Sequence, residues 1–180
     1  MMSDFLELAG RRYSCRNFSD KPVEREKLEK CVEAARLAPS GCNAQPWKFV
    51  VVVDPKLVSE VAKTTQQLGI NDYLSKAKAF LVVLEDHAKL MPRIASLYDS
   101  QVFAKGDLGG ATLSFCLEAE SLGLGTCMAG MFDRAKLSEL LDLPLDQRYF
   151  LVVAVGYPAR EREEARPKLR KPFNEIVRFI

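Results

Sequence analysis

Histidine is almost absent from this chain, since His87 is the only one among 180 residues. A histidine-based metal site needs several such ligands, and a Ser-His-Asp triad would have to use this one residue. The Gly-x-Ser-x-Gly motif of many serine hydrolases is also missing. These absences argue against most hydrolase and metalloenzyme chemistry, so we expect no metal ion.

An excess of charge and a long apolar run are absent as well. Lys plus Arg number 26 and Asp plus Glu number 24, which gives no case for nucleic-acid or membrane-surface binding. No apolar run approaches the ~20 residues of a membrane span, and the N-terminus lacks the pattern of a signal peptide. The five cysteines form no Cys-x-x-Cys pair. We therefore expect a cytoplasmic protein with reduced thiols, bound to neither membrane nor nucleic acid.

The composition, 48% apolar and 28% charged, predicts one globular domain over residues 1–180. Helices are expected over residues 4–10, 22–38, 56–68 and 107–122, and after a cap at Asp133. Strands are expected over residues 48–54, 79–84 and 149–155, while residues 126–131 favour a strand or an extended loop. Residues 87–101 show only weak periodicity. Three strong strands between helices predict an α/β or α+β fold.

Two short basic segments lie near opposite ends of the chain. Arg12-x-Ser14-x-Arg16 places two guanidinium groups and a hydroxyl within one short segment, a set that can bind phosphate. In an extended chain, Lys168-x-Arg170 points both cations to one side. Each segment also fits a solvated basic stretch. If the two converge, they can hold one dianion.

A loop of small and polar residues precedes the first expected strand. Residues 38–47 read Ala-Pro-Ser-Gly-Cys-Asn-Ala-Gln-Pro-Trp, an irregular segment whose amides suit the hydrogen-bonding edge of a planar heterocycle. Trp47, the only tryptophan, is expected mainly to pack in the core.

A glycine-rich turn follows the helix expected over residues 107–122. Gly123 and Gly125 suggest a dinucleotide fingerprint, but that pattern requires glycine where Met128 stands and should follow a strand. A Rossmann-type NAD site is therefore a poor interpretation. Ala129 and Gly130 are instead small enough for a flat ring to lie close to the backbone.

Two further features suggest contact with a partner. The helix over 107–122 is rich in small residues, which fit a subunit interface and ordinary core packing equally well. The chain ends in an apolar tail with Phe173, Ile176, Phe179 and Ile180. Such a tail docks either on its own sheet or on a partner's.

In this order, these segments resemble the nitroreductase family of FMN-dependent oxidoreductases. The resemblance lies in RYSCRNF, APSGCNAQPW, the glycine-rich helix with its Gly-Leu-Gly turn, and the closing strand with its Lys-x-Arg and tail. It implies an α+β fold, a mixed central sheet flanked by helices, in an intertwined homodimer with FMN sites at the interface. It also implies that residues 63–103 are a variable lid-like region and that the tail, residues 172–180, reaches the partner subunit.

The resemblance also assigns roles by position. Arg12, Ser14, Lys168 and Arg170 would hold the FMN phosphate, with Tyr13 contributing its backbone. Arg16 would lie at the pyrimidine edge of the flavin, where a cation favours the anionic reduced form, and Asn71 is a further candidate there. Met128, Ala129 and Gly130 would line the ring, and Pro39, Ser40, Gly41, Asn43 and Gln45 would approach it from the other subunit. Cys42 and Cys127 would lie nearby as small buried fillers, with a redox role as the alternative.

The implied activity transfers electrons from NAD(P)H through FMN to a nitroaromatic, quinone or similar conjugated acceptor, without a catalytic side chain. Two alternatives stay open: a flavin-binding carrier or sensor without turnover, and a dimerisation module that binds no flavin. The lid-like region is short and carries no clear motif, and Met128 stands where related small members often have an aromatic residue. The sequence therefore leaves the acceptor and the nicotinamide preference open.

Overall fold

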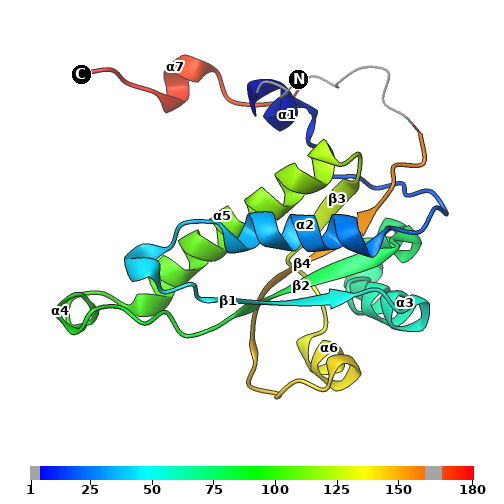
Figure 1. Ribbon diagram of the computed structural model, residues 1–180, viewed down its shortest axis with the longest axis horizontal. Coiled ribbons are helices and arrows are strands. Elements are labelled where there is room, and N and C mark those ends of the chain that lie inside the picture. Colours follow the sequence, from blue (N-terminus) through cyan, green and yellow to red (C-terminus); the bar gives the residue numbers. More distant parts are fainter. Residues whose placement is uncertain (1–4, 161–167) are drawn as a thin grey trace.

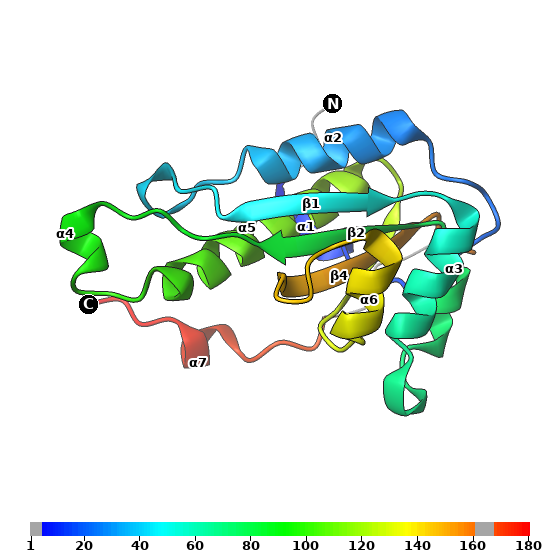
Figure 2. The ribbon, with the colours of Figure 1, turned by 90° about the horizontal axis from the view of Figure 1, so that it is seen from below.

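A central antiparallel sheet lies between two layers of helices in the computed structural model, which describes residues 5–160 and 168–180 (Figures 1 and 2). Helices α2 (Arg25–Arg36) and α5 (Ser100–Ser121) cover one face. Helices α3 (Pro55–Thr64) and α6 (Arg134–Leu141) cover the other. This arrangement confirms the α+β prediction.

The sheet has the strand order β1-β2-β4-β3, and neighbouring strands are antiparallel. The strands are β1 (Trp47–Val52), β2 (Ala79–Glu85), β3 (Gly125–Ala129) and β4 (Arg148–Gly156). The segment over 126–131, left open between strand and loop, thus contributes the edge strand β3. Among the described residues, the parallel pairing expected of a mixed sheet is limited to the isolated bridge between Ser14 and Thr126.

Strand β2 shows why the sheet lies inside the molecule. All seven of its residues are buried. Leu81 and Val83 pack in the core formed with α2 and α5, whereas Phe80 and Val82 pack in the core on the opposite face. A strand covered on both faces needs a continuous apolar run, which is what made this strand predictable. Trp47 lies in the α2–α5 core, as expected.

Several helix boundaries differ from the predictions, and local hydrogen bonds explain two of them. Helix α5 begins at Ser100 rather than at residue 107, because the Asp99 carboxylate accepts the Gln101 N–H at 2.9 Å and caps the helix. Helix α3 ends at Thr64 rather than at residue 68, and the hydroxyls of Thr64 and Thr65 donate to carbonyls in its last turn. Helix α2 begins three residues later than expected, at Arg25.

The remaining elements are short. They are α1 (Phe5–Arg11), α4 (Pro92–Ala95), α7 (Phe173–Ile176) and three 3-10 turns, Gly41–Asn43, Gln67–Gly69 and Asp72–Lys76. Helix α4 lies within the stretch of weak periodicity. Helix α1 packs on α5, and the C-terminal segment with α7 lies on the same side of the molecule as α1 (Figure 1). Among the described residues, every helix is too short or too polar to span a lipid bilayer.

The segment after α1 is hydrogen-bonded beside β3 and β4, and it packs closely against a glycine in each of these strands. The Cys15 N–H donates to the Thr126 carbonyl at 2.8 Å, and Ser19 N–H donates to Tyr157 at 2.8 Å. A Cβ on Gly125 would lie 2.7 Å from Cys15 Cβ, and one on Gly156 would lie 2.8 Å from the Phe18 ring. Both positions therefore exclude larger residues, and this close packing fixes the predicted phosphate-binding segment against the sheet.

Candidate functional site

The side chains of the first basic segment alternate between the core and the surface. Cys15 is 1% exposed, while Ser14 and Arg16 on either side of it are exposed. Extended backbone directs successive side chains to opposite sides, so burial of Cys15 turns its neighbours outward. The local fold thus presents a hydroxyl and a guanidinium beside the start of β3.

The second basic segment meets the first. The Lys168 ammonium donates a hydrogen bond to the Arg12 carbonyl, although the two residues lie near opposite ends of the chain. Arg170 follows two residues later and is exposed. We call Arg12, Lys168 and Arg170 the basic cluster. Arg11 lies next to the cluster, but it faces Glu7 at 3.6 Å and Glu120 at 4.0 Å.

The edge strand β3 offers an open surface next to this cluster. Met128 is 40% exposed, although Cys127 and Ala129 on either side are buried. The Thr126 carbonyl points away from β4, toward Cys15. Backbone groups alternate along a strand, so the Met128 N–H and C=O also point to this open edge. A Cβ on Gly130 would meet nothing within 4 Å, so there is room beside the backbone.

Arg16 lies over an aromatic ring that the sequence did not single out. Its guanidinium carbon is 5.5 Å from the centre of the Tyr73 ring, and contact with Tyr73 is the main cause that raises the pKa of Arg16 above its usual value. The Tyr73 hydroxyl donates to the Asn71 side-chain oxygen at 2.7 Å. Asn71 in turn donates to the Thr65 carbonyl at 3.1 Å. The side-chain nitrogen and oxygen of Asn71, which was predicted to contact the flavin, are thus both hydrogen-bonded within the chain.

The two cysteines predicted near the cofactor differ in environment. Cys127 is 3% exposed, and burial raises the pKa of its thiol above the usual value, which disfavours the reactive thiolate. This fits the filler interpretation. Cys42 is exposed in the chain, so the expectation of a buried filler is wrong there. Cys42 lies in the 3-10 turn Gly41–Asn43, with a left-handed φ of 52°.

The loop over residues 39–45 is held in an unusual conformation. Cys42, Asn43 and Gln45 all have positive φ angles. Such angles cost roughly 1–3 kcal/mol each for residues other than glycine and are found often at ligand sites. The Ser40 hydroxyl accepts the Gln45 N–H at 3.0 Å, and the Gly41 N–H donates to Asp107 on α5 at 3.1 Å.

The loop and the basic cluster lie at opposite ends of α5 (Figures 1 and 2). Gly41 contacts Asp107, whereas the segment at Arg11 contacts Glu120. At about 1.5 Å per residue, these two acidic residues are ~20 Å apart along the helix axis. One chain therefore brings Lys168 to Arg12 and the 12–16 segment to the start of β3, but it does not bring the 39–45 loop to either of them.

Comparison with known proteins decides the family. A model of the nitroreductase family matches residues 9–157, most of the chain. This chain belongs to the nitroreductase family. A protein provisionally named NADH dehydrogenase/NAD(P)H nitroreductase from Archaeoglobus fulgidus is 34% identical over 167 residues, covering 90% of each chain. FMN reductase (NAD(P)H) from Bacillus subtilis is 30% identical over 183 residues, covering 93% of this chain and 71% of its own.

A solved structure gives the same result for the fold. The crystal structure of a nitroreductase family protein from Clostridium difficile 630 superposes with a TM-score of 0.80 at 30% identity. The match covers 98% of each chain. The nitroreductase fold therefore extends over nearly the whole sequence, including the segments that carry no motif.

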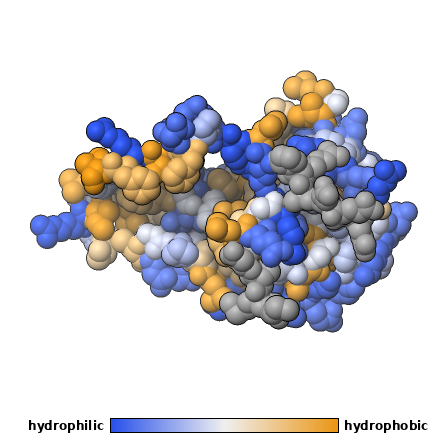
Figure 3. Space-filling model, turned by 90° about the horizontal axis from the view of Figure 1, so that it is seen from above, coloured by the Kyte–Doolittle hydropathy of each residue, from blue (hydrophilic) through white to orange (hydrophobic). Residues whose placement is uncertain are grey.

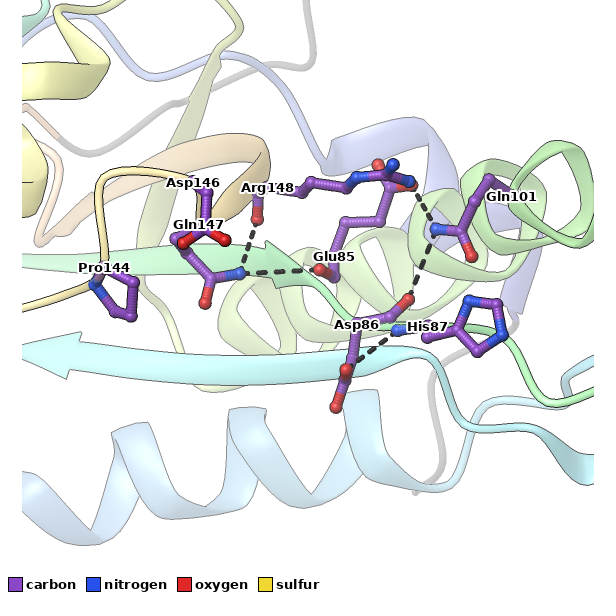
Figure 4. Close-up of a pocket in the computed structure, with 8 residues that line it drawn as sticks. All are labelled: Glu85, Asp86, His87, Gln101, Pro144, Asp146, Gln147 and Arg148. Carbon is purple, nitrogen blue, oxygen red and sulfur yellow. Dashed lines mark hydrogen bonds and ion pairs between the residues drawn. The ribbon is translucent and has the colours of Figure 1, made fainter.

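A polar cavity of about 360 Å³ lies elsewhere in this nitroreductase-family chain, where β2 ends and β4 begins (Figure 4). None of the predicted site residues lines it. Glu85, 9% exposed, accepts a hydrogen bond from Gln101 at 2.5 Å and faces Arg148 at 3.8 Å. Asp86 pairs with Lys48 at 2.9 Å, which lowers the pKa of that carboxyl. These charges already neutralise one another, so the cavity is a weaker candidate site than the open edge of β3.

The Asp107 carboxylate is the contact that anchors the 39–45 loop to α5. We expect Asp107→Ala to weaken FMN binding about tenfold, because a hydrogen bond to a charged group contributes roughly 1.5–3 kcal/mol. Loss of this bond should also lower the melting temperature of the FMN-free protein by several degrees, at about 2–4 °C per kcal/mol. Asp146→Ala, an exposed aspartate away from the loop, is the control. Titration of the FMN-free protein with FMN measures the effect, and an unchanged affinity in Asp107→Ala would contradict the anchoring role.

Proposed function

We propose that this chain is an FMN-dependent oxidoreductase that takes electrons from NAD(P)H and passes them to a nitroaromatic, a quinone or a similar conjugated acceptor. Membership of the nitroreductase family, with relatives named as NAD(P)H nitroreductase and FMN reductase, confirms the predictions of an NAD(P)H oxidoreductase and of FMN. The choice of acceptor is our inference. The observation that carries the proposal is the meeting of Lys168 with Arg12 beside the open edge of β3.

The residues present fit a flavin mononucleotide. Its phosphate is a dianion, and the basic cluster with the exposed Ser14 hydroxyl supplies charged and neutral donors of the kind that bind phosphate oxygens. The exposed Met128 edge, with free space at Gly130, accommodates a planar ring with hydrogen-bonding groups. Arg16 supplies a positive charge that offsets the negative charge gained on reduction. These residues would hold FMN, whose flavin ring would supply hydride acceptance from the nicotinamide and electron donation to the acceptor.

We propose that the site is completed by a second copy of the chain, whose 39–45 loop covers the flavin. The separation of loop and basic cluster along α5 supports this arrangement. Exposed apolar side chains support it too, because an uncovered apolar surface of this kind marks an interaction site. They lie on α5 (Val102, Phe103, Leu113) and on the tail (Phe173, Ile176, Phe179, Ile180). Figure 3 shows apolar atoms gathered on the side of the molecule that carries the C-terminal segment.

Two further assignments follow from the same proposal. Residues 63–103 include the central strand β2, so we assign the lid role to the exposed segments on either side of it, Gln67–Gly69 and Pro92–Ala95. We place the reaction in the cytoplasm, where the five free thiols stay reduced.

The visible spectrum of the purified protein, followed by stopped-flow mixing with NADH or NADPH without oxygen, tests the proposal. We expect the absorbance of oxidised flavin, its bleaching by at least one nicotinamide, and its return when a quinone or nitroaromatic is added. A yellow protein that neither nicotinamide bleaches would favour the carrier or sensor alternative. A colourless protein that takes up no added FMN would favour the dimerisation module.

A further inference from the structure

Tyr73 forms a platform under the guanidinium of Arg16. The guanidinium carbon lies 5.5 Å from the ring centre, within the range of a cation–π interaction. The two residues are far apart in sequence, and Tyr73 lies in the 3-10 turn Asp72–Lys76, which carries no family motif. Nothing in the roles assigned above uses this aromatic ring.

The platform itself is fixed at both ends. The Tyr73 hydroxyl donates to Asn71, and Asn71 donates to the carbonyl of Thr65, which is fully buried. The adjacent Leu74 is also fully buried, and the Tyr73 ring packs against the core that contains Phe80. The ring therefore has little freedom to follow Arg16, so Arg16 has to adapt to the ring.

We propose that Tyr73 is a positioning residue that holds the Arg16 guanidinium at the flavin edge and thereby stabilises the reduced cofactor relative to the oxidised one. This inference rests on the proposed function. Arg16 is exposed and has many rotamers. Attraction to a fixed ring selects a few of them, and a charge held near the cofactor acts more strongly than one that moves away from it.

The selectivity for the reduced state follows from charge. Only the reduced flavin carries the added negative charge, so the position of Arg16 affects its binding more than that of oxidised FMN. Removal of the Tyr73 ring should therefore change the ratio of the two dissociation constants. The midpoint potential of bound FMN reports this ratio directly, whereas a general loss of structure would weaken both states together.

The experiment measures the midpoint potential of bound FMN and the affinity for oxidised FMN in Tyr73→Leu. We expect oxidised FMN to bind within twofold of the unaltered protein and reduced FMN to bind about threefold more weakly. For a two-electron couple, in which a tenfold ratio equals about 30 mV, this shift is about 14 mV toward lower potential. Should Tyr73→Leu not fold, Tyr73→Met fills a similar volume without a π face and should give the same shift.

Two variants serve as controls. Tyr73→Phe keeps the ring face and its core packing but loses the bond to Asn71, so it should shift the potential less than half as far as Tyr73→Leu. Tyr157→Leu removes a second tyrosine that also lies under a cation, Lys21 at 3.9 Å, and bonds to a carboxylate, Glu24 at 2.6 Å, but lies outside the proposed site. It should leave the potential unchanged.

A double-variant comparison isolates the path through Arg16. Arg16→Gln alone should lower the potential by about 30 mV, a tenfold effect, and adding Tyr73→Leu to it should add nothing. An unchanged potential in Tyr73→Leu would overturn the inference, as would an equal shift with and without Arg16. The proposed function would survive either outcome, because it fails only if the unaltered protein binds no FMN or is not reduced by NAD(P)H.

Discussion

Replacing Arg12 and Arg170 together by alanine should weaken FMN binding by at least about 100-fold and leave the fold intact. Each charge-assisted contact to a phosphate contributes roughly 1.5–3 kcal/mol, and about 1.4 kcal/mol corresponds to a factor of ten. Loss of two contacts therefore predicts that the dissociation constant for FMN rises by a factor between about 10² and 10⁴. Both side chains are at least partly exposed, so their removal leaves no buried cavity. Titration of the FMN-free protein with FMN, followed by flavin fluorescence, measures the change.

The double variant Arg25→Ala with Lys136→Ala is the matched control for charge. Arg25 on α2 and Lys136 on α6 each pair with a glutamate on the same helix, at 2.8 Å and 2.9 Å. This control also removes two positive charges, but from surfaces that carry neither the basic cluster nor the 39–45 loop. It should change FMN affinity less than about threefold, because exposed charges farther apart than ~10 Å are largely screened by salt. Equal losses in both double variants would mean that net charge, and not the basic cluster, controls binding.

Gly125→Ala should lower the melting temperature of the FMN-free protein by up to about 12 °C. The new Cβ would lie 2.7 Å from Cys15 Cβ and 2.8 Å from its sulfur, so one strand has to move. Overpacking of this kind costs roughly 1–3 kcal/mol, and one kcal/mol is about 2–4 °C for a protein of this size. The movement should also displace Ser14 and weaken FMN binding, since Cys15 ties this segment to β3.

Gly10→Ala is the control for the glycine substitution. Gly10 lies in α1, where an added Cβ meets nothing within 4 Å. Alanine is favoured over glycine within a helix by about 1 kcal/mol, so the melting temperature should stay the same or rise. Thermal unfolding of both variants without FMN separates packing from cofactor binding. A Gly125→Ala protein as stable as the unaltered one would show that the contact between Cys15 and β3 is loose.

The helices and strands predicted most accurately are those whose apolar residues follow directly from burial, on both faces of a strand or on one face of a helix. Strand β2 is buried on both faces, so its unbroken apolar run identified it. Leu28, Cys31 and Ala35 fall at helical spacing and are all buried on α2. The start of α5 was missed because its first turns carry no clear apolar stripe, and the cap at Asp99 decides where the helix begins. The cap at Asp133 was predicted from the sequence, whereas Asp99 was not singled out because no clear apolar stripe follows it.

The candidate site divides in the same way. Arg12, Ser14 and Lys168 were proposed because their residue types match phosphate chemistry within short segments, and the fold brings Lys168 to the Arg12 carbonyl. Tyr73 and Asp107 were not singled out, because each makes its contact with a distant part of the chain, Arg16 and Gly41 respectively. Only the folded backbone brings these pairs together, and neither residue belongs to a local motif. Positioning residues of this kind therefore require a structure.

Heterodimers of two FMN-binding-deficient variants would show whether one FMN site takes its segments from two chains. One chain would carry Arg12→Ala with Arg170→Ala and the other Asn43→Ala with Gln45→Ala, each with its own affinity tag. Both variants should bind FMN poorly as homodimers. In the purified heterodimer, one of the two FMN sites would combine an intact basic cluster from one chain with an intact loop from the other. We therefore expect a single tightly bound FMN per heterodimer. A heterodimer without tightly bound FMN would show that both segments must come from the same chain, and would rule out a site shared between two copies.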